Sequence, residues 1–154
     1  MFTIDASVHI SALNPAEEGS PESQAFLERV SRRPWPVFSP TLLLVEVAAA
    51  VARVFDDTGR GLAMARAIRG LPGQMWIPLD EALAEEAARL AAKYRVRGAD
   101  AVYAAVVWRY EVTLVTRDRQ QLERLQPALP VLTPAEALAQ LDEREGGGEG
   151  RSFV

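Results

Sequence analysis

Short apolar or β-branched runs alternate with longer helical segments along this chain of 154 residues, and this alternation most constrains its fold. Strands are expected at residues 1–4, 75–79 and 112–116, with an edge strand at 130–134. Helices are expected at residues 22–30, 41–55, 62–71, 80–96, 97–108, 117–125 and 135–141. Strands that alternate with helices predict an α/β fold, a sandwich built around a mainly parallel central sheet.

The domain organisation follows from length and from turn-forming residues. Residues 1–141 are expected to form one domain, long enough to bury a core. Three prolines in residues 32–40 predict a break in regular structure, with Ser39 and Pro40 as the cap and first turn of the next helix. The tail, residues 142–154, is charged and rich in glycine, so we expect it to be disordered.

Composition excludes several kinds of chemistry. The chain has no cysteine and one histidine, His9, which excludes thiolate and multi-histidine metal sites and leaves oxygen ligands for hard cations. The only lysine is Lys93, and the formal net charge of −4 is weak evidence against nucleic-acid binding. The longest apolar stretch, residues 42–55, is too short to span a bilayer, and no signal peptide opens the chain. We therefore expect a cytoplasmic protein without a membrane partner.

Two aspartates follow predicted strands. Asp5 comes directly after the first strand, and Asp118 lies two residues past the strand at 112–116. The carboxyl ends of parallel strands meet at one edge of a sheet, which is where ligands bind. Thr116 adds a hydroxyl at the same edge. The alternative is that both aspartates cap the helices that follow them.

Two further carboxylates lie on apolar helices. Glu46 has only apolar neighbours three and four residues away along its helix, so no local base neutralises it. The alternative to a ligand role is a buried pair with a distant arginine. Asp100 begins an Ala/Val-rich helix in "RGADAVYAAVVW", where a helix cap and a ligand are compatible roles.

Gathered at one sheet edge, these four carboxylates would repel one another unless a cation bound them. An all-oxygen ligand set favours Mg²⁺ or Mn²⁺, which activates water and stabilises charge at a phosphodiester. The residues therefore predict a divalent-cation site held by Asp5, Glu46, Asp100 and Asp118.

Four motifs occur in a fixed order: "IDASV" at residues 4–8, "SPTLLLVEVAAAV" at 39–51, "GADAVYAAVV" at 98–107 and "VTLVTRDRQQL" at 112–122. The set resembles the PIN-domain family, and specifically the VapC-type toxins of prokaryotic toxin–antitoxin systems. The resemblance covers roughly residues 2–138. One departure is Leu122, where an aromatic residue is common in the family.

The resemblance implies a three-layer α/β/α fold and an endoribonuclease that depends on Mg²⁺ or Mn²⁺. It assigns the acidic quartet to Asp5, Glu46, Asp100 and Asp118, with Ser7 and Thr116 as supporting polar residues. It also implies an RNA substrate, a cognate antitoxin and a homodimer. On this basis Asp5, Asp100 and Glu46 hold the principal ion directly or through water, and Asp118 completes the site or holds a second ion.

Arginines flank the proposed ligands. Arg97, Arg117 and Arg119 are candidates for contact with RNA phosphates, the alternative being solvated helix ends. Trp35 is interpreted as a packing residue and His9 as a structural or surface residue, because neither has a visible catalytic partner.

Two other functions are compatible with these residues. A DNA or flap nuclease of the same fold would share the chemistry, and a non-catalytic metal- and protein-binding module would share the helix at 41–55. A receiver domain is disfavoured because the first strand ends in a single acid and Lys93 precedes the strand at 112–116. A haloacid dehalogenase-like enzyme is disfavoured because Asp5 opens D-x-S where that class needs D-x-D.

Overall fold

The computed structural model describes residues 1–33 and 35–146 and contains a five-stranded sheet in the order β3-β2-β1-β4-β5, with every pairing parallel. The strands are β1 (Phe2–Ile4), β2 (Val37–Pro40), β3 (Gln74–Ile77), β4 (Thr113–Val115) and β5 (Val131–Leu132). The helices of this part of the chain are α1 (Ala6–Ala12), α2 (Ser20–Arg32), α3 (Leu42–Phe55), α4 (Thr58–Arg69), α5 (Glu81–Tyr94), α6 (Gly98–Tyr110), α7 (Arg119–Leu125) and α8 (Pro134–Gly146). The prediction of a three-layer α/β/α fold with a parallel sheet is confirmed.

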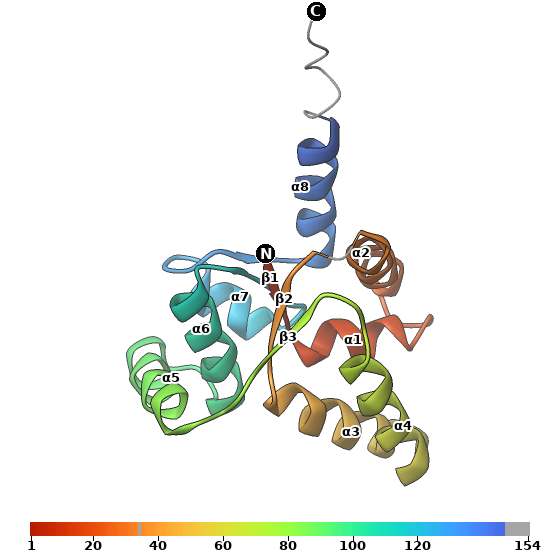
Figure 1. Cartoon of the computed structure of the whole chain (residues 1–154), viewed down its shortest axis with the longest axis horizontal. Helices are drawn as coiled ribbons and strands as arrows, with labels where there is room; N and C mark the ends of the chain where they lie inside the picture. Colours follow the sequence, from red (N-terminus) through yellow and green to blue (C-terminus); the bar gives the residue numbers. More distant parts are fainter. Residues whose placement is uncertain (34, 147–154) are drawn as a thin grey trace, which may run out of the picture.

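The two faces of the sheet are buried against different helices. Successive strand residues point to opposite faces, so Leu114 joins a core cluster with α3, α5 and α6, whereas Val115 joins one with α2 and α8. Figure 1 shows α5 and α6 on one side of the strands and α1 and α2 on the other. Both faces are covered, as parallel sheets require.

Helix α6 is the central helix of the larger cluster. It contacts β1, β2 and β4 on one side and packs along α5 on the other, which is why residues 100–107 are all buried. A helix that is apolar all round belongs in an interior position of this kind. Because α6 ends where β4 begins, its first turn lies at the opposite edge of the sheet, the edge formed by the carboxyl ends of the strands.

The segment expected to break regular structure contains strand β2, so that prediction was wrong. The residue before a proline prefers an extended backbone, and Trp35 and Ser39 each precede one. Pro40 ends the strand opposite Ile77 of β3. Ser39 therefore does not cap α3: its hydroxyl donates to Gln74, and Thr41 occupies the N-cap without a side-chain cap bond.

The last helix extends further than expected. We predicted disorder from residue 142, but α8 continues through Gly146. Arg29 of α2 binds Asp142 and Glu145 of α8, each at 2.6 Å, and these ion pairs stabilise the helix end. Residues 147–154 of the predicted tail lie outside the described residues. None of the helices that the structure describes is long and apolar enough to cross a membrane.

Candidate active site

The two carboxylates that follow strands are held by helix-capping geometry. Asp5 is the N-cap of α1, and its Oδ2 accepts hydrogen bonds from the Ser7 backbone N–H at 3.3 Å and the Thr116 hydroxyl at 3.1 Å. Asp118 is the N-cap of α7, and its Oδ1 accepts from the Gln121 backbone N–H at 3.1 Å. The Asp118 backbone N–H in turn donates to the Thr116 hydroxyl at 3.0 Å. Thr116 therefore joins the two aspartates.

Glu46 lies on the face of α3 that points toward these aspartates. Its Oε2 accepts a hydrogen bond of 2.6 Å from the hydroxyl of Tyr103, a completely buried residue of α6. Burial raises the pKa of Glu46, and the nearby charges of Asp5 and Asp100 raise it further. The Tyr103 hydrogen bond and the charge of Arg97 oppose that rise in pKa.

Asp100 lies in the first turn of α6 and is 5 % exposed. Its Oδ1 accepts from the Gln121 side-chain amide at 2.8 Å, and its Oδ2 accepts from Arg97 Nε at 2.9 Å. Burial raises the pKa of Asp100, and Asp118 and Asp5 add to the rise, whereas Arg97 lowers it. The pKa values of both helix-borne carboxylates are thus raised by desolvation and by the other acids.

Arg97 bridges two of the four acids. Its Nε binds Asp100, and a terminal guanidinium nitrogen binds Asp118 Oδ2. The side chain is 61 % exposed, so it reaches in from the surface. Its two carboxylate partners raise the pKa of the guanidinium, which stays charged.

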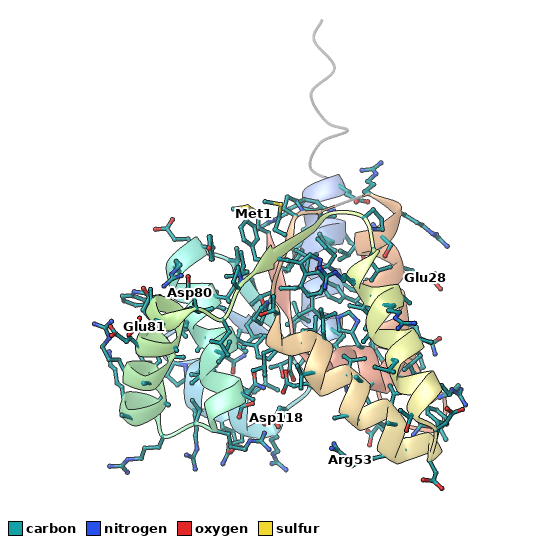
Figure 2. All side chains as sticks on the ribbon, turned by 60° about the horizontal axis from the view of Figure 1, so that its bottom comes forward. Met1, Glu28, Arg53, Asp80, Glu81 and Asp118 are labelled. Carbon is teal, nitrogen blue, oxygen red and sulfur yellow. The ribbon has the colours of Figure 1, made fainter. Side chains whose placement is uncertain are left out.

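All four predicted acids line one cavity of about 440 Å³ at the carboxyl edge of the sheet. Ser7, Arg97 and Gln121 also line it, as does Arg53 from further along α3. Figure 2 labels Asp118 and Arg53, which lie on the same side of the molecule. The fold therefore brings together residues that are more than a hundred positions apart in the sequence.

Two predicted arginines lie elsewhere. Arg117 turns away from the acids toward the connection between α1 and α2, where it binds Ser11, Glu17 and the backbone carbonyl of Glu18. Its backbone N–H donates to the Ser7 hydroxyl at 3.1 Å. The arrangement ties β4 to α1, and the Arg117 guanidinium is already bound within the chain.

Arg119 also stays outside the cavity. It pairs with Glu123 one turn along α7 at 3.1 Å, and its side chain is 91 % exposed. Among the three arginines predicted to contact RNA, Arg97 is the one whose side chain lines the acidic cavity.

Three residues of the site were missed from the sequence. Tyr103 had a signal, since it is the one side chain with a polar atom among residues 101–107. Arg53 lies seven residues after Glu46 and so falls on the same face of α3. Gln121 had no comparable signal, because a glutamine in a short polar helix is ordinary.

His9 takes no part in the acidic cavity. It is buried on α1, where burial lowers its pKa to about 4. It lines a separate, largely apolar cavity of about 300 Å³ with residues of α2 and α4. We expected a structural or a surface role for His9, and its enclosed position agrees with the structural one and not with the surface one.

The oxygens of the acidic quartet show what the site can bind. In each carboxylate one oxygen accepts a hydrogen bond from a neutral donor. In Asp100 and Asp118 the second oxygen accepts a hydrogen bond from Arg97. As these side chains stand, no three Asp, Glu or His residues within 1–33 and 35–146 form a metal-coordinating group. A cation that used those two oxygens would have to displace the Arg97 guanidinium from them.

The geometry defines a class of protein: a parallel three-layer α/β/α domain with an acidic cavity at the carboxyl edge of its sheet. A family profile described as "PIN domain" matches residues 2–126. The chain belongs to the PIN domain family. No curated protein sequence matched the chain.

Solved structures share the fold at low sequence identity. VapC20 of Mycobacterium tuberculosis, described as a Sarcin-Ricin loop cleaving toxin, has a TM-score of 0.68 at 16% identity and covers 80% of this chain and 94% of its own. A toxin–antitoxin complex from Klebsiella pneumoniae gives 0.62 at 19%, covering 87% and 98%. VapBC2 of Rickettsia felis, bound to a DNA fragment from its promoter, gives 0.64 at 13%, covering 86% and 97%.

Proposed function

We propose that this protein is a metal-dependent endoribonuclease that acts as the toxin of a type II toxin–antitoxin pair. The observation that carries the proposal is the meeting of Asp5, Glu46, Asp100 and Asp118 from four separate elements in one cavity. Burial and neighbouring acids raise the pKa of Glu46 and of Asp100, and raised carboxyl pKa values of this kind are typical of functional sites. The structural likeness to proteins described as toxins supports the biological role.

The chemistry of the cavity fits a hydrated Mg²⁺ or Mn²⁺ ion. The donor set is carboxylate oxygen, which these cations prefer. The side-chain oxygen of Gln121 is buried and has no donor among the described residues, and a water ligand of the ion is a donor of the kind it lacks. We assign Asp5, Glu46 and Asp100 to hold the ion directly or through water, with Asp118 completing the site or holding a second ion.

When bound, the ion would activate a water molecule and stabilise charge on the scissile phosphate. The chain's own residues leave water as the nucleophile, because there is no cysteine and His9 lies outside the cavity. The Ser7 hydroxyl is occupied by Thr116 and by the Arg117 backbone N–H. We therefore propose hydrolysis without a covalent enzyme intermediate.

Arg97 is the first candidate for binding the RNA backbone. Once its guanidinium leaves Asp100 and Asp118, it stands at the cavity with two or more donors suited to phosphate. Arg53 also lines the cavity, is exposed and forms no ion pair within the described residues, so it is a second candidate for contact with phosphate. Arg117 and Arg119 are weaker candidates because intramolecular partners already bind them.

The partners are proposed from the same likeness. A cognate antitoxin and a homodimer are expected of a toxin of this type, and the neighbour from Klebsiella pneumoniae, described as a toxin–antitoxin complex, supports the antitoxin. Size-exclusion chromatography of the purified chain, alone and with its genomic neighbour, tests both partners.

The deciding experiment incubates the purified protein with total RNA and with single-stranded DNA, in Mg²⁺ and in EDTA. We expect RNA cleavage in Mg²⁺ alone, and a loss of more than about a hundredfold in the Asp100→Asn variant. The matched control is Asp80→Asn, which changes the N-cap of α5 outside the cavity. If Asp100→Asn cleaved RNA as fast as the wild type, the site assignment would be wrong.

Other outcomes separate the alternatives. Cleavage of DNA in preference to RNA would indicate a DNA-directed nuclease of the same fold. Absence of any metal-dependent cleavage, with a folded protein, would indicate a non-catalytic binding module.

A further inference from the structure

Two buried neutral side chains hold the helix-borne acids of the cavity. Tyr103 and Gln121 are 0% and 1% exposed, and each donates a hydrogen bond to one oxygen of one carboxylate. We propose that both are positioning residues: each fixes one carboxylate oxygen so that the other oxygen is available to a divalent cation. This inference rests on the proposed metal-dependent activity.

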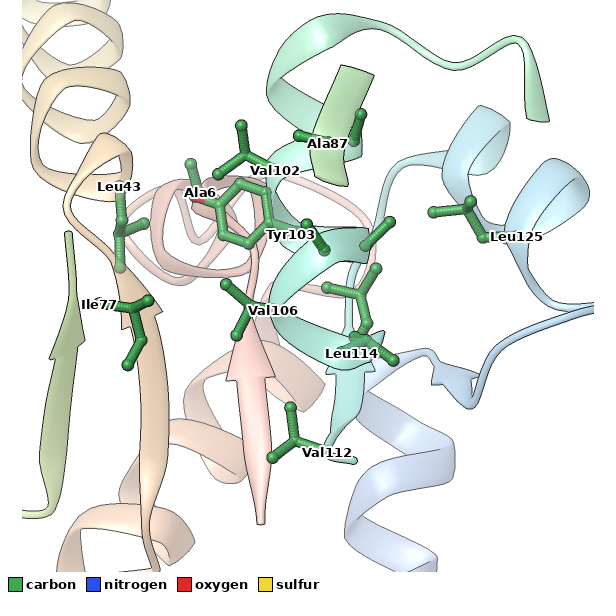
Figure 3. Close-up of a cluster of buried hydrophobic side chains, with 14 of the residues drawn as sticks. Ala6, Leu43, Ile77, Ala87, Val102, Tyr103, Val106, Val112, Leu114 and Leu125 are labelled. Carbon is green, nitrogen blue, oxygen red and sulfur yellow. The ribbon is translucent and has the colours of Figure 1, made fainter. Parts of the chain in front are cut away.

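The ring of Tyr103 has a packing role that does not require its hydroxyl. Figure 3 shows the ring between α6 and Ala6 at the start of α1, among apolar side chains from several elements. A phenylalanine would fill that space equally well. The hydroxyl instead donates to Glu46 Oε2 at 2.6 Å and so joins α6 to α3.

Glu46 needs such a partner more than the strand-end aspartates do. A glutamate side chain has three rotatable bonds, and ordering it costs conformational entropy. Asp5 and Asp118 are shorter and accept backbone hydrogen bonds at helix N-caps, whereas Glu46 lies mid-helix, where backbone donors are already used. The Tyr103 hydroxyl supplies the restraint that the local backbone does not.

Gln121 acts on two acids at once. Its side-chain amide donates to Asp100 Oδ1 at 2.8 Å, and its backbone N–H donates to Asp118 Oδ1 at 3.1 Å. Because an ionised carboxylate only accepts hydrogen bonds, the amide nitrogen must face Asp100. Gln121 thereby holds the carboxylates of α6 and α7 in a fixed relation to each other.

The neutrality of both side chains is what suits them to this role. A lysine or arginine in either position would hold the carboxylate but would also cancel the charge that a cation needs. A hydroxyl and an amide donate without adding charge. The positively charged donor at the site is Arg97, whose side chain is exposed and can move away from the carboxylates. Tyr103 and Gln121, in contrast, are enclosed.

The test compares Tyr103→Phe and Gln121→Met with the wild type by calorimetric titration of Mn²⁺ without RNA. Both variants preserve side-chain volume and remove the donor. We expect each to weaken Mn²⁺ binding by about tenfold to a hundredfold, the range found for groups that orient metal ligands. The controls are Tyr94→Phe on α5 and Gln126→Met after α7, whose side chains do not line the cavity.

Three further readouts separate positioning from a structural effect. The melting temperature should change little, and the KM for RNA should stay within about twofold while kcat falls at limiting Mn²⁺ and recovers at excess Mn²⁺. In a Glu46→Gln background, Tyr103→Phe should cause no further loss of Mn²⁺ affinity, because the carboxylate it positions is gone.

The outcomes distinguish this inference from the function on which it rests. Wild-type protein that binds Mn²⁺ and cleaves RNA, with both variants binding Mn²⁺ equally well, overturns the inference alone. Equal losses in the Glu46→Gln and wild-type backgrounds also overturn it for Tyr103. Wild-type protein that binds no Mn²⁺ overturns both the inference and the proposed function.

Discussion

The carboxylates that follow strands and the carboxylates on helix faces reach the same cavity by different means. Asp5 and Asp118 lie one or three residues past their strands and accept hydrogen bonds from the backbone of the helices they cap. Glu46 and Asp100 are held by side chains from other elements, Tyr103 and Gln121. The first pair is placed by local sequence and the second pair by tertiary packing.

The difference has an electrostatic consequence. Burial raises the pKa of both Glu46 and Asp100, so ionising them inside the fold is costly. A bound cation would offset the cost of ionisation more at Glu46 and Asp100 than at Asp5 and Asp118. Asp5, Asp118 and Asp100 all lie at helix N-termini, where the positive end of the helix favours a negative side chain, whereas Glu46 lies further along its helix.

The largest expected effect comes from a variant that separates the helix-capping role of Asp5 from its proposed role as a metal ligand. Asp5→Asn keeps an effective N-cap, because asparagine caps helices as well as aspartate does. We expect the melting temperature to be nearly unchanged and RNA cleavage to fall by more than about a hundredfold. Asp57→Asn makes the same change at the N-cap of α4, outside the cavity, and should retain full activity. If Asp5→Asn and Asp57→Asn cleaved RNA equally well, Asp5 would be a helix cap and not a metal ligand.

A second prediction concerns pH and the helix-borne pair. The raised pKa values mean that the folded chain holds protons on Glu46 and Asp100 more tightly than the unfolded chain does. The free energy of unfolding that these two groups contribute is therefore lost as the pH rises from the ordinary carboxylate range through their raised pKa values. Mn²⁺ competes with those protons, and its affinity should rise by about tenfold per pH unit for each proton released.

Thermal melts with and without Mn²⁺, at about pH 5 and about pH 7.5, measure this competition. The rise in melting temperature caused by Mn²⁺ should be larger at the higher pH. In Glu46→Gln protein the pH dependence of that rise should be weaker. An Mn²⁺ effect of the same size at both pH values would argue against the helix-borne pair as ligands.

The smallest expected effect concerns Arg97, which binds one acid of each pair. Arg97→Met frees Asp100 Oδ2 and Asp118 Oδ2 and should tighten Mn²⁺ binding by about fivefold, since an exposed arginine contributes on the order of 1 kcal/mol. The same variant should weaken RNA binding. Arg89→Met removes a surface pair with Glu85 and serves as the control. Weaker Mn²⁺ binding in Arg97→Met would mean that the arginine orders the acids and does not compete for them.

Arg97 and Arg117 show the limit of reasoning from sequence position. Both lie within three residues of a predicted ligand, and both were expected to contact RNA. The structure places Arg97 between two acids, whereas Arg117 is bound at the connection between α1 and α2. Nothing local distinguishes them, because the partners of Arg117 are about a hundred residues away in the sequence.

Strand β2 shows a second limit. Its prolines suggested a break in regular structure, yet the segment pairs with β1 and β3. Pairing with two neighbouring strands outweighs a weak local preference, and the prolines at its edges are compatible with an extended backbone. The shorter α8 that we predicted was wrong for a similar reason, since its end is held by Arg29 of another helix.

By itself the sequence determined most of the alternation of strands and helices, the parallel sheet and the positions of Asp5 and Asp118 at the carboxyl edge of that sheet. These features depend on local periodicity and on the rule that carboxyl ends of parallel strands share one edge. Only the tertiary structure decided which oxygens of those acids are held and by which side chains. Hydrogen bonds such as Tyr103 to Glu46 join residues 57 positions apart, and their partners are chosen by packing between elements, which no local pattern encodes.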